Sequence, residues 1–353
     1  MKNISESIAD KYIGVVGSGS FGTAIANLLA TKNKRILLYV RDAEKLQKII
    51  HTRESAGQQL SDNIKLTGNL EELGKECDVI FPIVPSAVFR ETMQRFSFYL
   101  KPYHILIHGT KGFDLNVDTE KLGDSKLPIA RKDVRTMSEV IREETSVIRV
   151  GCLAGPNLSH EIAENKPAAT VIASHFDEVI NTGQRLLKNE RFLVYGSNDL
   201  KGTELCGILK NIYAIGAGAI ESLNLGENAK ALFISRGLVE MVHIGKALGV
   251  KPEIFFGVAG VGDLIATCNS TNSRNFQFGF RLGKGESAND IIASMDEVAE
   301  GIRTIDIVRR LAFTLKVKVP ITEIIDRIIK REITVAEAHV FFMKFPFRTE
   351  IIF

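Results

Sequence analysis

The sequence lacks the long apolar segments of membrane and secreted proteins. Its longest apolar stretch, residues 207–220, is interrupted by Lys210 and Asn211, so it falls short of the roughly 18 uncharged apolar residues of a membrane span. The first ten residues mix charged and polar side chains and contain no apolar core of a signal peptide. We therefore expect a cytoplasmic protein with no membrane span.

Excess charge and metal-binding motifs are also absent. The 45 basic and 42 acidic residues leave a net charge of +3, which is too balanced for a nucleic-acid surface. The four cysteines form no C-x-x-C pair, which favours buried, reduced thiols over a metal centre. The chain contains neither G-x-S-x-G nor H-E-x-x-H, so the chemistries of those motifs are excluded and no metal is predicted.

Length and apolar pattern predict two domains. A chain of 353 residues corresponds to about two domains of roughly 150 residues. Apolar runs predict strands at residues 12–16, 35–40, 78–84, 104–108, 168–174 and 192–195, separated by helical stretches, as in a doubly wound and mostly parallel sheet. Beyond them the patterns are helical. We expect an α/β domain over residues 8–198 and an all-α domain over residues 199–353.

A glycine-rich turn follows the first predicted strand. Gly17, Gly19 and Gly22 form G-S-G-S-F-G between that strand and an apolar helix. In a Rossmann-like domain such glycines permit a tight turn, close approach of a pyrophosphate, and close packing of helix on strand. The amides at the helix start then face the anion. We interpret the motif as a dinucleotide site, and an ordinary tight turn is the alternative.

The end of the second strand bears on the choice between NAD and NADP. Arg41 follows Val40 directly, and Asp42 comes next. A guanidinium can pair with a 2′-phosphate, whereas an acidic residue would accept a hydrogen bond from a ribose 2′-hydroxyl. We favour NADP on the strength of Arg41, and Asp42 keeps NAD open.

A lysine stands among small residues in the helix predicted at residues 204–222. The large apolar residues share one face of this helix, and Lys210 points almost opposite, beside Cys206, Ala214 and Ala217. Small neighbours indicate that something packs there, which would desolvate the ammonium and lower its pKa. A lysine of that kind suits proton transfer near neutral pH. The alternative is a lysine that reaches solvent at the edge of the helix.

Several polar residues are candidates for binding an anion. Asp263 follows a glycine-rich stretch, and Ser273, Arg274 and Asn275 form a run of donors that could hold a phosphate or form only a polar loop. Lys111 follows the strand that ends at residue 108, at the edge of the sheet where doubly wound folds bind ligands. Residues 155–157 follow another possible strand in the same way.

In sequence order, these motifs resemble the NAD(P)-dependent glycerol-3-phosphate dehydrogenase family, and its bacterial and organellar soluble form is the nearest match. The resemblance spans nearly the whole chain. It is carried by the glycine-rich turn, VPS at 84–86, TKG at 110–112, AGP at 154–156, LKNIYAIGAG from Leu209, GVGDLIATC from Gly260, NSRN from Asn272 and VAEG from Val298.

The resemblance implies reversible reduction of dihydroxyacetone phosphate to sn-glycerol 3-phosphate for glycerophospholipid synthesis, by a homodimer. Lys210 matches the catalytic lysine of the family. The matching substrate-binding residues are Lys111, Gly155, Asn157, Asp263, Ser273, Arg274 and Asn275. The matching cofactor-binding residues are Gly17, Gly19, Ser20, Phe21, Gly22, Arg41, Lys111, Ser159, Arg274, Val298 and Glu300. Asn157 stands where the family usually has Ser or Thr, and Ser159 where it usually has Ala.

Two other functions stay open. A related two-domain dehydrogenase could act on a 3-hydroxyacyl-CoA or a sugar acid, but the NSRN run after GDL…TC favours a small phosphate. A non-catalytic nicotinamide-binding regulator would need only the cofactor residues. The presence of Lys210, Lys111, Asp263 and Arg274 together therefore favours the enzyme.

Overall fold

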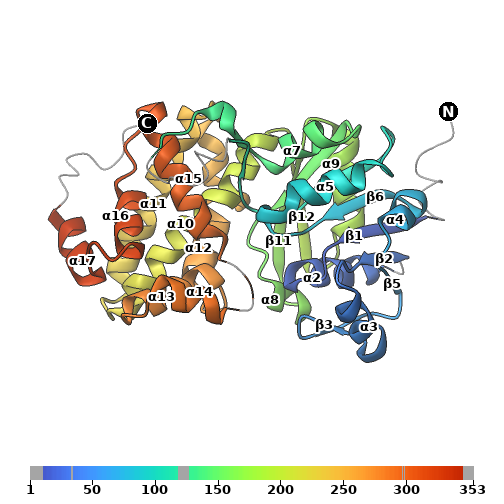
Figure 1. The fold of residues 1–353 in the computed structure, drawn as a ribbon, viewed down its shortest axis with the longest axis horizontal. Coiled ribbons are helices and arrows are strands. Elements are labelled where there is room, and N and C mark those ends of the chain that lie inside the picture. The colour runs from blue at the N-terminus through green and yellow to red at the C-terminus, as the bar shows by residue number, and fades with distance from the viewer. Residues whose placement is uncertain (1–10, 33–34, 118–126, 296, 298, 345–353) are drawn as a thin grey trace. The chain divides into compact units, whose positions relative to one another are not determined.

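The chain folds into two compact units, which are described separately. Figure 1 shows a computed structural model that describes residues 11–32, 35–117, 127–295, 297 and 299–344. Of these, unit 1 takes residues in the ranges Met1–Thr110 and Thr136–Leu200, and unit 2 takes those in Lys111–Arg135 and Lys201–Phe353. The expected boundary near residue 198 lies close to Leu200. Residues 111–135, which we expected in the first domain, group with unit 2.

Unit 1 is built on an eight-stranded sheet in the order β12-β11-β10-β7-β6-β1-β2-β5. Every neighbouring pair is parallel except β10–β11. The strands are β1 (Tyr12–Val16), β2 (Ile36–Tyr39), β5 (Ile64–Thr67), β6 (Cys77–Pro82), β7 (Ile105–His108), β10 (Arg149–Ala154), β11 (Ala168–Ser174) and β12 (Phe192–Ser197). The order reverses between β1 and β6, and doubly wound sheets bind ligands beyond the strand ends at such a point.

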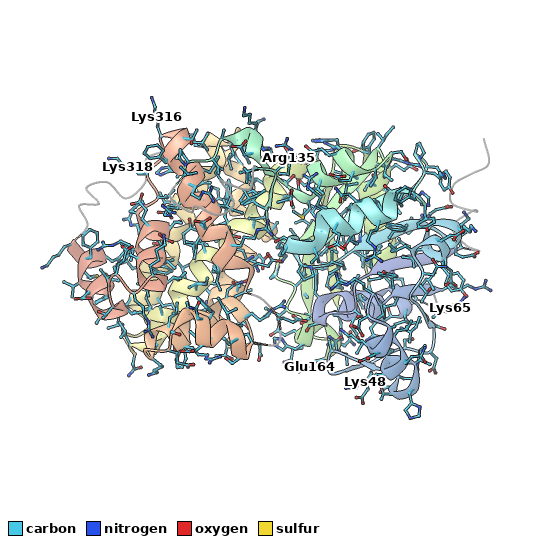
Figure 2. The ribbon with its side chains drawn as sticks, viewed as in Figure 1. Lys48, Lys65, Arg135, Glu164, Lys316 and Lys318 are labelled. Carbon is cyan, nitrogen blue, oxygen red and sulfur yellow. The ribbon has the colours of Figure 1, made fainter. Side chains whose placement is uncertain are left out.

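The predicted strands of this sheet are confirmed, and the doubly wound class with them. β5 was not predicted, because its four residues, IKLT, offer little apolar signal. It lies at one edge of the sheet, where Lys65 projects from the surface, as does Lys48 of the nearby helix α3 (Ala43–Thr52) (Figure 2). A charged side chain on an edge strand discourages pairing with another chain.

Helices cover both faces of the sheet because successive strand residues point to opposite sides. Ile13 and Val15 belong to one buried cluster with α2 (Ser20–Ala30), α3, α8 (Ser159–Ala163) and α9 (Asp177–Leu187). Val16 and Leu37 belong to the other, with α4 (Leu70–Glu76), α5 (Phe89–Ser97) and α7 (Met137–Glu144). Figure 1 shows these helices along the strands. Each fully buried Leu, Ile or Phe in these clusters contributes about 1.5–3 kcal/mol.

Unit 2 is helical, as predicted for the second half of the chain. Its helices are α10 (Leu200–Ser222, whose first residue belongs to unit 1), α11 (Glu227–Ala247), α12 (Asp263–Asn269), α13 (Arg274–Gly283), α14 (Ala288–Ser294), α15 (Glu300–Leu315), α16 (Pro320–Ile329) and α17 (Val335–Lys344). Pro320 starts α16, and Pro252 starts the short turn η3 (Pro252–Phe256), because proline suits the first turn of a helix.

Two glycines let helices α10 and α13 cross at backbone contact. A Cβ on Gly279 would lie 1.8 Å from the carbonyl oxygen of Ile215, and a Cβ on Gly218 would lie 2.0 Å from that of Phe276. No larger residue fits at either position. The crossing brings the start of α13 beside the middle of α10, where the candidate site residues of both helices lie.

Within residues 111–135, the described residues form a short hairpin and contact the rest of unit 2 through polar groups. Strand β8 (Asp114–Leu115) pairs antiparallel with β9 (Val134–Arg135). The Arg310 side chain of α15 donates a hydrogen bond from Nε to the carbonyl oxygen of Leu127 at 2.8 Å. Lys111 therefore belongs to the same unit as α10 and α12.

Two further findings concern the helices and the cysteines of the described residues. In the described part of the chain, no helix combines the length and apolarity needed to cross a bilayer. The four cysteines are free and buried, as predicted from their spacing.

Candidate functional site

The glycine-rich turn lies at the carboxyl end of β1. Gly17 has a φ of +118°, and a Cβ there would lie 2.1 Å from the carbonyl oxygen of Ile83. A Cβ on Gly22 would lie 2.1 Å from the carbonyl oxygen of Gly17. Gly19 precedes α2 and offers no capping side chain, and the first turn of α2 contains no acidic residue. The turn therefore fits a dinucleotide pyrophosphate at the start of α2.

Side chains from α3, β3 (Glu54–Ser55) and β4 (Gln58–Gln59) hold two carbonyl groups of this turn. Ser55 Oγ and Lys45 Nζ both donate to the Ser18 carbonyl oxygen, at 3.0 Å each. Gln58 Nε2 donates to the Ser20 carbonyl oxygen at 2.9 Å. Ser55 and Gln58 lie on the strands β3 and β4. Sequence reasoning missed these supports because a lone Ser, Gln or Lys carries no recognisable pattern.

The remaining cofactor candidates of unit 1 surround the ends of β1 and β2. Ser20 and Phe21 begin α2, and Phe21 lies against Gly109 after β7. Arg41 follows β2 and is exposed. Asp42 caps α3, because its Oδ1 accepts a hydrogen bond from the backbone N–H of Lys45 at 2.6 Å. Asp42 therefore has a structural role that its sequence position alone did not reveal.

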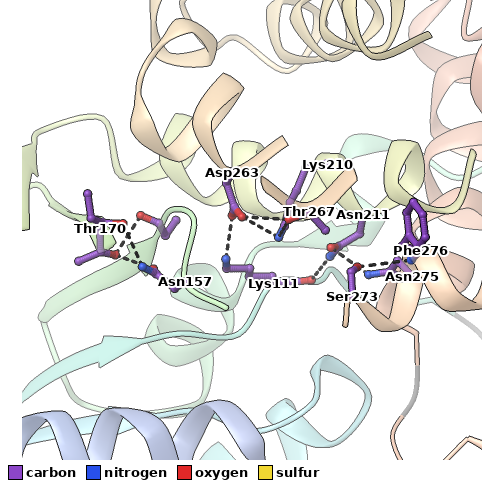
Figure 3. Close-up of polar contacts among 12 residues, drawn as sticks. Lys111, Asn157, Thr170, Lys210, Asn211, Asp263, Thr267, Ser273, Asn275 and Phe276 are labelled. Atoms are coloured by element: carbon purple, nitrogen blue, oxygen red, sulfur yellow. Dashed lines mark hydrogen bonds and ion pairs between the residues drawn. The ribbon is translucent and has the colours of Figure 1, made fainter. Parts of the chain in front are cut away.

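A second group in unit 1 follows β10. Gly155 has a φ of +150°, a conformation that favours glycine. Asn157 is buried, donates from Nδ2 to the Ala169 carbonyl oxygen at 2.9 Å, and accepts from Thr170 Oγ1 at 2.8 Å (Figure 3). Ser159 begins α8. The Asn157 side chain is thus held in place by β11.

The centre of the site in unit 2 is a buried carboxylate between two lysines. Asp263 accepts hydrogen bonds from Lys210 Nζ at Oδ1 and from Lys111 Nζ at Oδ2, each at 2.8 Å (Figure 3). Asp263 is 1% exposed and Lys210 is 6% exposed. A turn of π-helix, η4 (Val258–Gly262), leads directly into Asp263, and such turns recur at functional sites.

Two residues that sequence reasoning missed complete this centre. Thr267, one turn after Asp263, accepts from Lys210 Nζ at 2.5 Å and donates to Asp263 Oδ1 at 3.1 Å. Asn211 donates from Nδ2 to the Lys111 carbonyl oxygen at 3.3 Å. The four-residue spacing from Asp263 to Thr267 was a usable signal, because residues i and i+4 share a helix face.

The electrostatics of the centre set the charge of its groups. Burial lowers the pKa of Lys210 from 10.5 to about 8, although the Asp263 carboxylate raises it, and the nearby Lys111 ammonium lowers it further. Burial alone would raise the pKa of Asp263, but the Lys111 and Lys210 ammonium groups outweigh burial and lower it. Lys210 can therefore give or take a proton near neutral pH while Asp263 stays ionised.

The predicted anion-binding run lies at the start of α13. Asn275 donates from Nδ2 to Asn211 Oδ1 at 3.1 Å and accepts from the backbone N–H of Gly301 at 2.9 Å. Ser273 caps α13. The Arg274 guanidinium forms an ion pair with Glu297. Thus α13 places these side chains in the same unit as Lys210 and next to Asn211.

The last two cofactor candidates precede or begin α15. Glu300 is the first residue of α15. Val298 lies outside the described residues. Within unit 2, the structure therefore brings Lys111, Lys210 and Asp263 into direct contact, with Asn275 joined to them through Asn211.

Comparison with known proteins matches the chain to one family. The family model for the NAD-dependent glycerol-3-phosphate dehydrogenase N-terminus matches residues 12–180, and the model for the C-terminus matches residues 199–340. The glycerol-3-phosphate dehydrogenase (NAD(P)+) of Acinetobacter baylyi is 39% identical over 321 residues, 90% of this chain and 85% of that protein. That of Ectopseudomonas mendocina is 36% identical over 345 residues, covering 97% and 96%.

The fold of the chain also matches that of a solved structure from the same family. The crystal structure of glycerol-3-phosphate dehydrogenase from Coxiella burnetii superposes with a TM-score of 0.84 and 29% identity, covering 95% of this chain and 99% of that one. The buried lysine–aspartate–lysine centre and the glycine-rich turn thus occur in a chain that matches this family over nearly its whole length. The chain belongs to the NAD-dependent glycerol-3-phosphate dehydrogenase family.

Proposed function

We propose that the protein transfers a hydride reversibly between NAD(P)H and dihydroxyacetone phosphate, giving sn-glycerol 3-phosphate, with Lys210 as its proton donor. The observation that carries the role of Lys210 is the buried ammonium that bonds both Asp263 and Thr267 and has a pKa of about 8. Family membership supports the reaction. The resemblance also supports a homodimer that acts in the cytoplasm and supplies glycerophospholipid synthesis.

The proposed proton step uses Lys210 and its two partners. A reduced nicotinamide bound at the site would supply the hydride to the carbonyl carbon. Negative charge then develops on the carbonyl oxygen, and Lys210 donates a proton to it, which completes the alcohol. Asp263 and Thr267 orient the Lys210 ammonium, and in the reverse direction neutral Lys210 accepts the proton. Lys111 adds a second positive charge near that oxygen.

Substrate phosphate binding is assigned to the start of α13. Arg274 can form two parallel hydrogen bonds to a phosphate, with Ser273 and Asn275 beside it. Contacts to the phosphate are remote from the carbonyl, so they position the carbonyl without taking part in the chemistry. In this role Arg274 exchanges its Glu297 partner for the substrate. Gly155 and Asn157 remain proposed substrate contacts of unit 1.

The cofactor is assigned to the glycine-rich turn of unit 1, and NADP is favoured over NAD. Gly17, Gly19 and Gly22 form the cradle for the pyrophosphate, with Ser20 and Phe21 at the start of α2. Arg41 is exposed after β2, whereas Asp42 is occupied as the cap of α3. Ser159, Lys111, Arg274, Val298 and Glu300 are the other proposed contacts.

The test is the loss of reduced-nicotinamide absorbance when dihydroxyacetone phosphate is added, run in parallel with NADPH and NADH. We expect rapid oxidation, faster with NADPH. Lys210→Ala should lower kcat by at least about 10³-fold and leave cofactor affinity largely intact, because a buried proton donor is lost. Lys246→Ala, an exposed lysine on α11, is the matched control and should retain wild-type turnover.

Two results would contradict the proposal. Absence of oxidation with either cofactor, despite measurable cofactor binding, would refute the assigned reaction. Normal turnover in Lys210→Ala would instead remove Lys210 from the mechanism while leaving the reaction intact.

A further inference from the structure

Lys45 brings a positive charge to the glycine-rich turn from a different element. It lies in the first turn of α3, the helix that follows β2, and its Nζ donates to the Ser18 carbonyl oxygen at 3.0 Å. Ser18 lies between Gly17 and Gly19, so the ammonium stands beside the turn that fits the pyrophosphate. The ammonium has three donors, and this bond uses one of them. Among the described residues, two of its donors therefore remain for a ligand.

The same residue also keeps Asp42 occupied. The backbone N–H of Lys45 donates to Asp42 Oδ1 at 2.6 Å, which makes Asp42 the N-cap of α3. An acidic residue at the end of β2 can accept a hydrogen bond from a free ribose 2′-hydroxyl, but Oδ1 of Asp42 already accepts one from this backbone N–H. The backbone of Lys45 therefore engages this carboxylate, while its side chain adds a cation nearby.

Arg41 and Lys45 lie on either side of Asp42 in the chain. In dinucleotide-binding folds the adenosine ribose lies at the end of the second strand, next to the glycine-rich turn. Arg41 follows that strand directly, and Lys45 bonds the turn itself. A phosphate on the ribose 2′-oxygen would thus meet one cation at the strand end and one at the turn.

We propose that Lys45 is a second specificity residue for the cofactor, which contacts the adenosine 2′-phosphate together with Arg41. The proposal rests on the assignment of the glycine-rich turn as the cofactor site. It assigns NADP selectivity to a pair of cations and assigns Asp42 to the cap of α3.

The competing explanation is that Lys45 only holds the turn in shape. Ser55 provides a direct comparison, because its Oγ donates to the same Ser18 carbonyl oxygen at the same 3.0 Å. A residue that only supports the turn should affect all dinucleotides equally, since the pyrophosphate is common to them. A residue that contacts the 2′-phosphate should affect only ligands that carry it.

The experiment measures dissociation constants by calorimetry for NADPH, NADH, adenosine 2′,5′-bisphosphate and adenosine 5′-monophosphate. The variants are Lys45→Ala, Lys45→Gln, Ser55→Ala and Lys48→Ala. Lys48 lies on the same helix and projects from the surface (Figure 2), so Lys48→Ala controls for the loss of one positive charge on α3. Lys45 is exposed and alanine favours helices, so the Lys45 variants should fold.

We expect Lys45→Ala to weaken NADPH and the bisphosphate by about tenfold, as for the loss of one charged contact, with NADH and the monophosphate changed by less than about twofold. Lys45→Gln should weaken the same two ligands, because glutamine lacks the positive charge of lysine. It keeps the ability to donate a hydrogen bond, so it separates the loss of charge from the loss of a donor. Ser55→Ala should weaken NADPH and NADH alike, and Lys48→Ala should change neither by more than about twofold.

Equal losses for NADPH and NADH in Lys45→Ala would overturn the proposal, as would no loss for either. An effect of Lys48→Ala as large as that of Lys45→Ala would also overturn it, since any positive charge on α3 would then attract the phosphate equally well. These measurements need no turnover. If the proposed reaction failed, the binding comparison could still be made, so the two failures can be told apart.

Discussion

At the scale of single residues, the site depends on one carboxylate that holds two ammonium groups. Asp263 bonds Lys210 with one oxygen and Lys111 with the other. An unpaired charge in such a buried place would be costly, and the arrangement leaves none of the three groups unpaired. Burial still favours the neutral form of Lys210 and lowers its pKa to about 8. The Lys210 ammonium is thus held in a fixed position by Asp263 and carries a proton that is easily released.

This pKa predicts opposite pH dependence for the two directions of the reaction. Reduction requires protonated Lys210, so kcat/KM for dihydroxyacetone phosphate should fall about tenfold per pH unit above pH 8. Oxidation of glycerol 3-phosphate requires neutral Lys210, so its kcat/KM should rise toward pH 8 and level off above it. Initial rates between about pH 6.5 and 9.5 measure both profiles. Profiles that bend in the same direction would contradict a single proton carried by Lys210.

At the scale of secondary structure elements, glycines decide how closely the helices of unit 2 approach. The α10–α13 crossing has backbone contact at Gly218 and Gly279. It places Asn275, at the start of α13, within hydrogen-bond distance of Asn211 on α10. Gly301 at the start of α15 donates to the same Asn275 side chain. The position of the proposed phosphate site therefore depends on the α10–α13 crossing at Gly218 and Gly279.

Replacing Gly279 by alanine should separate these helices. Its Cβ would lie 1.8 Å from the Ile215 carbonyl oxygen, which is part of the backbone and cannot rotate away. We expect a loss of at least about 2 kcal/mol in the free energy of unfolding and a raised KM for dihydroxyacetone phosphate. The chain contains no tryptophan, so circular dichroism during urea unfolding is the suitable measurement.

A matched glycine in the same unit provides the control for that variant. Gly262 has helical dihedral angles of −61° and −50°, and the nearest atom to an added Cβ is 3.8 Å away. Gly262→Ala should therefore leave the stability unchanged or slightly raised. Equal losses in the two variants would show that backbone crowding at the crossing is not the cause.

At the scale of the whole molecule, the chain passes between its two units at residues 110, 135 and 200. Lys111 follows directly on Thr110, the last residue of the first segment of unit 1, but its ammonium donates a hydrogen bond to Asp263 of unit 2. The boundary expected near residue 198 is close to the last of these passages and stays a prediction for the functional domains. The earlier passages were not expected, because residues 111–135 show no break in composition.

The proposed homodimer can be tested on the intact protein. The chain has a mass of 39.0 kDa, so sedimentation velocity should give a species of about 78 kDa, twice that value. A single species of about 39 kDa at micromolar concentration would contradict the dimer.

The sequence by itself determined the fold class and the approximate positions of the predicted sheet strands of unit 1. It did so because burial on both faces of a parallel sheet demands short continuous apolar runs, which are visible without a structure. The glycine-rich turn was equally visible, because Gly17 and Gly22 occupy positions where no side chain fits. Lys210 was singled out because it breaks the polarity pattern of its helix. The anion-binding candidates were visible as polar runs after strands and glycines, and the family resemblance added their roles and the remaining cofactor contacts.

Only the tertiary structure decided which of these residues meet. Lys111, Lys210 and Asp263 are far apart in the chain, and their contacts depend on three-dimensional packing that no local pattern encodes. Sequence reasoning considered Asp42 only as a ribose ligand, and the hydrogen bond from the Lys45 backbone showed that it also caps α3. Lys45 carried no signal at all, because a lysine in an exposed helix is ordinary until its ammonium is found on the Ser18 carbonyl oxygen.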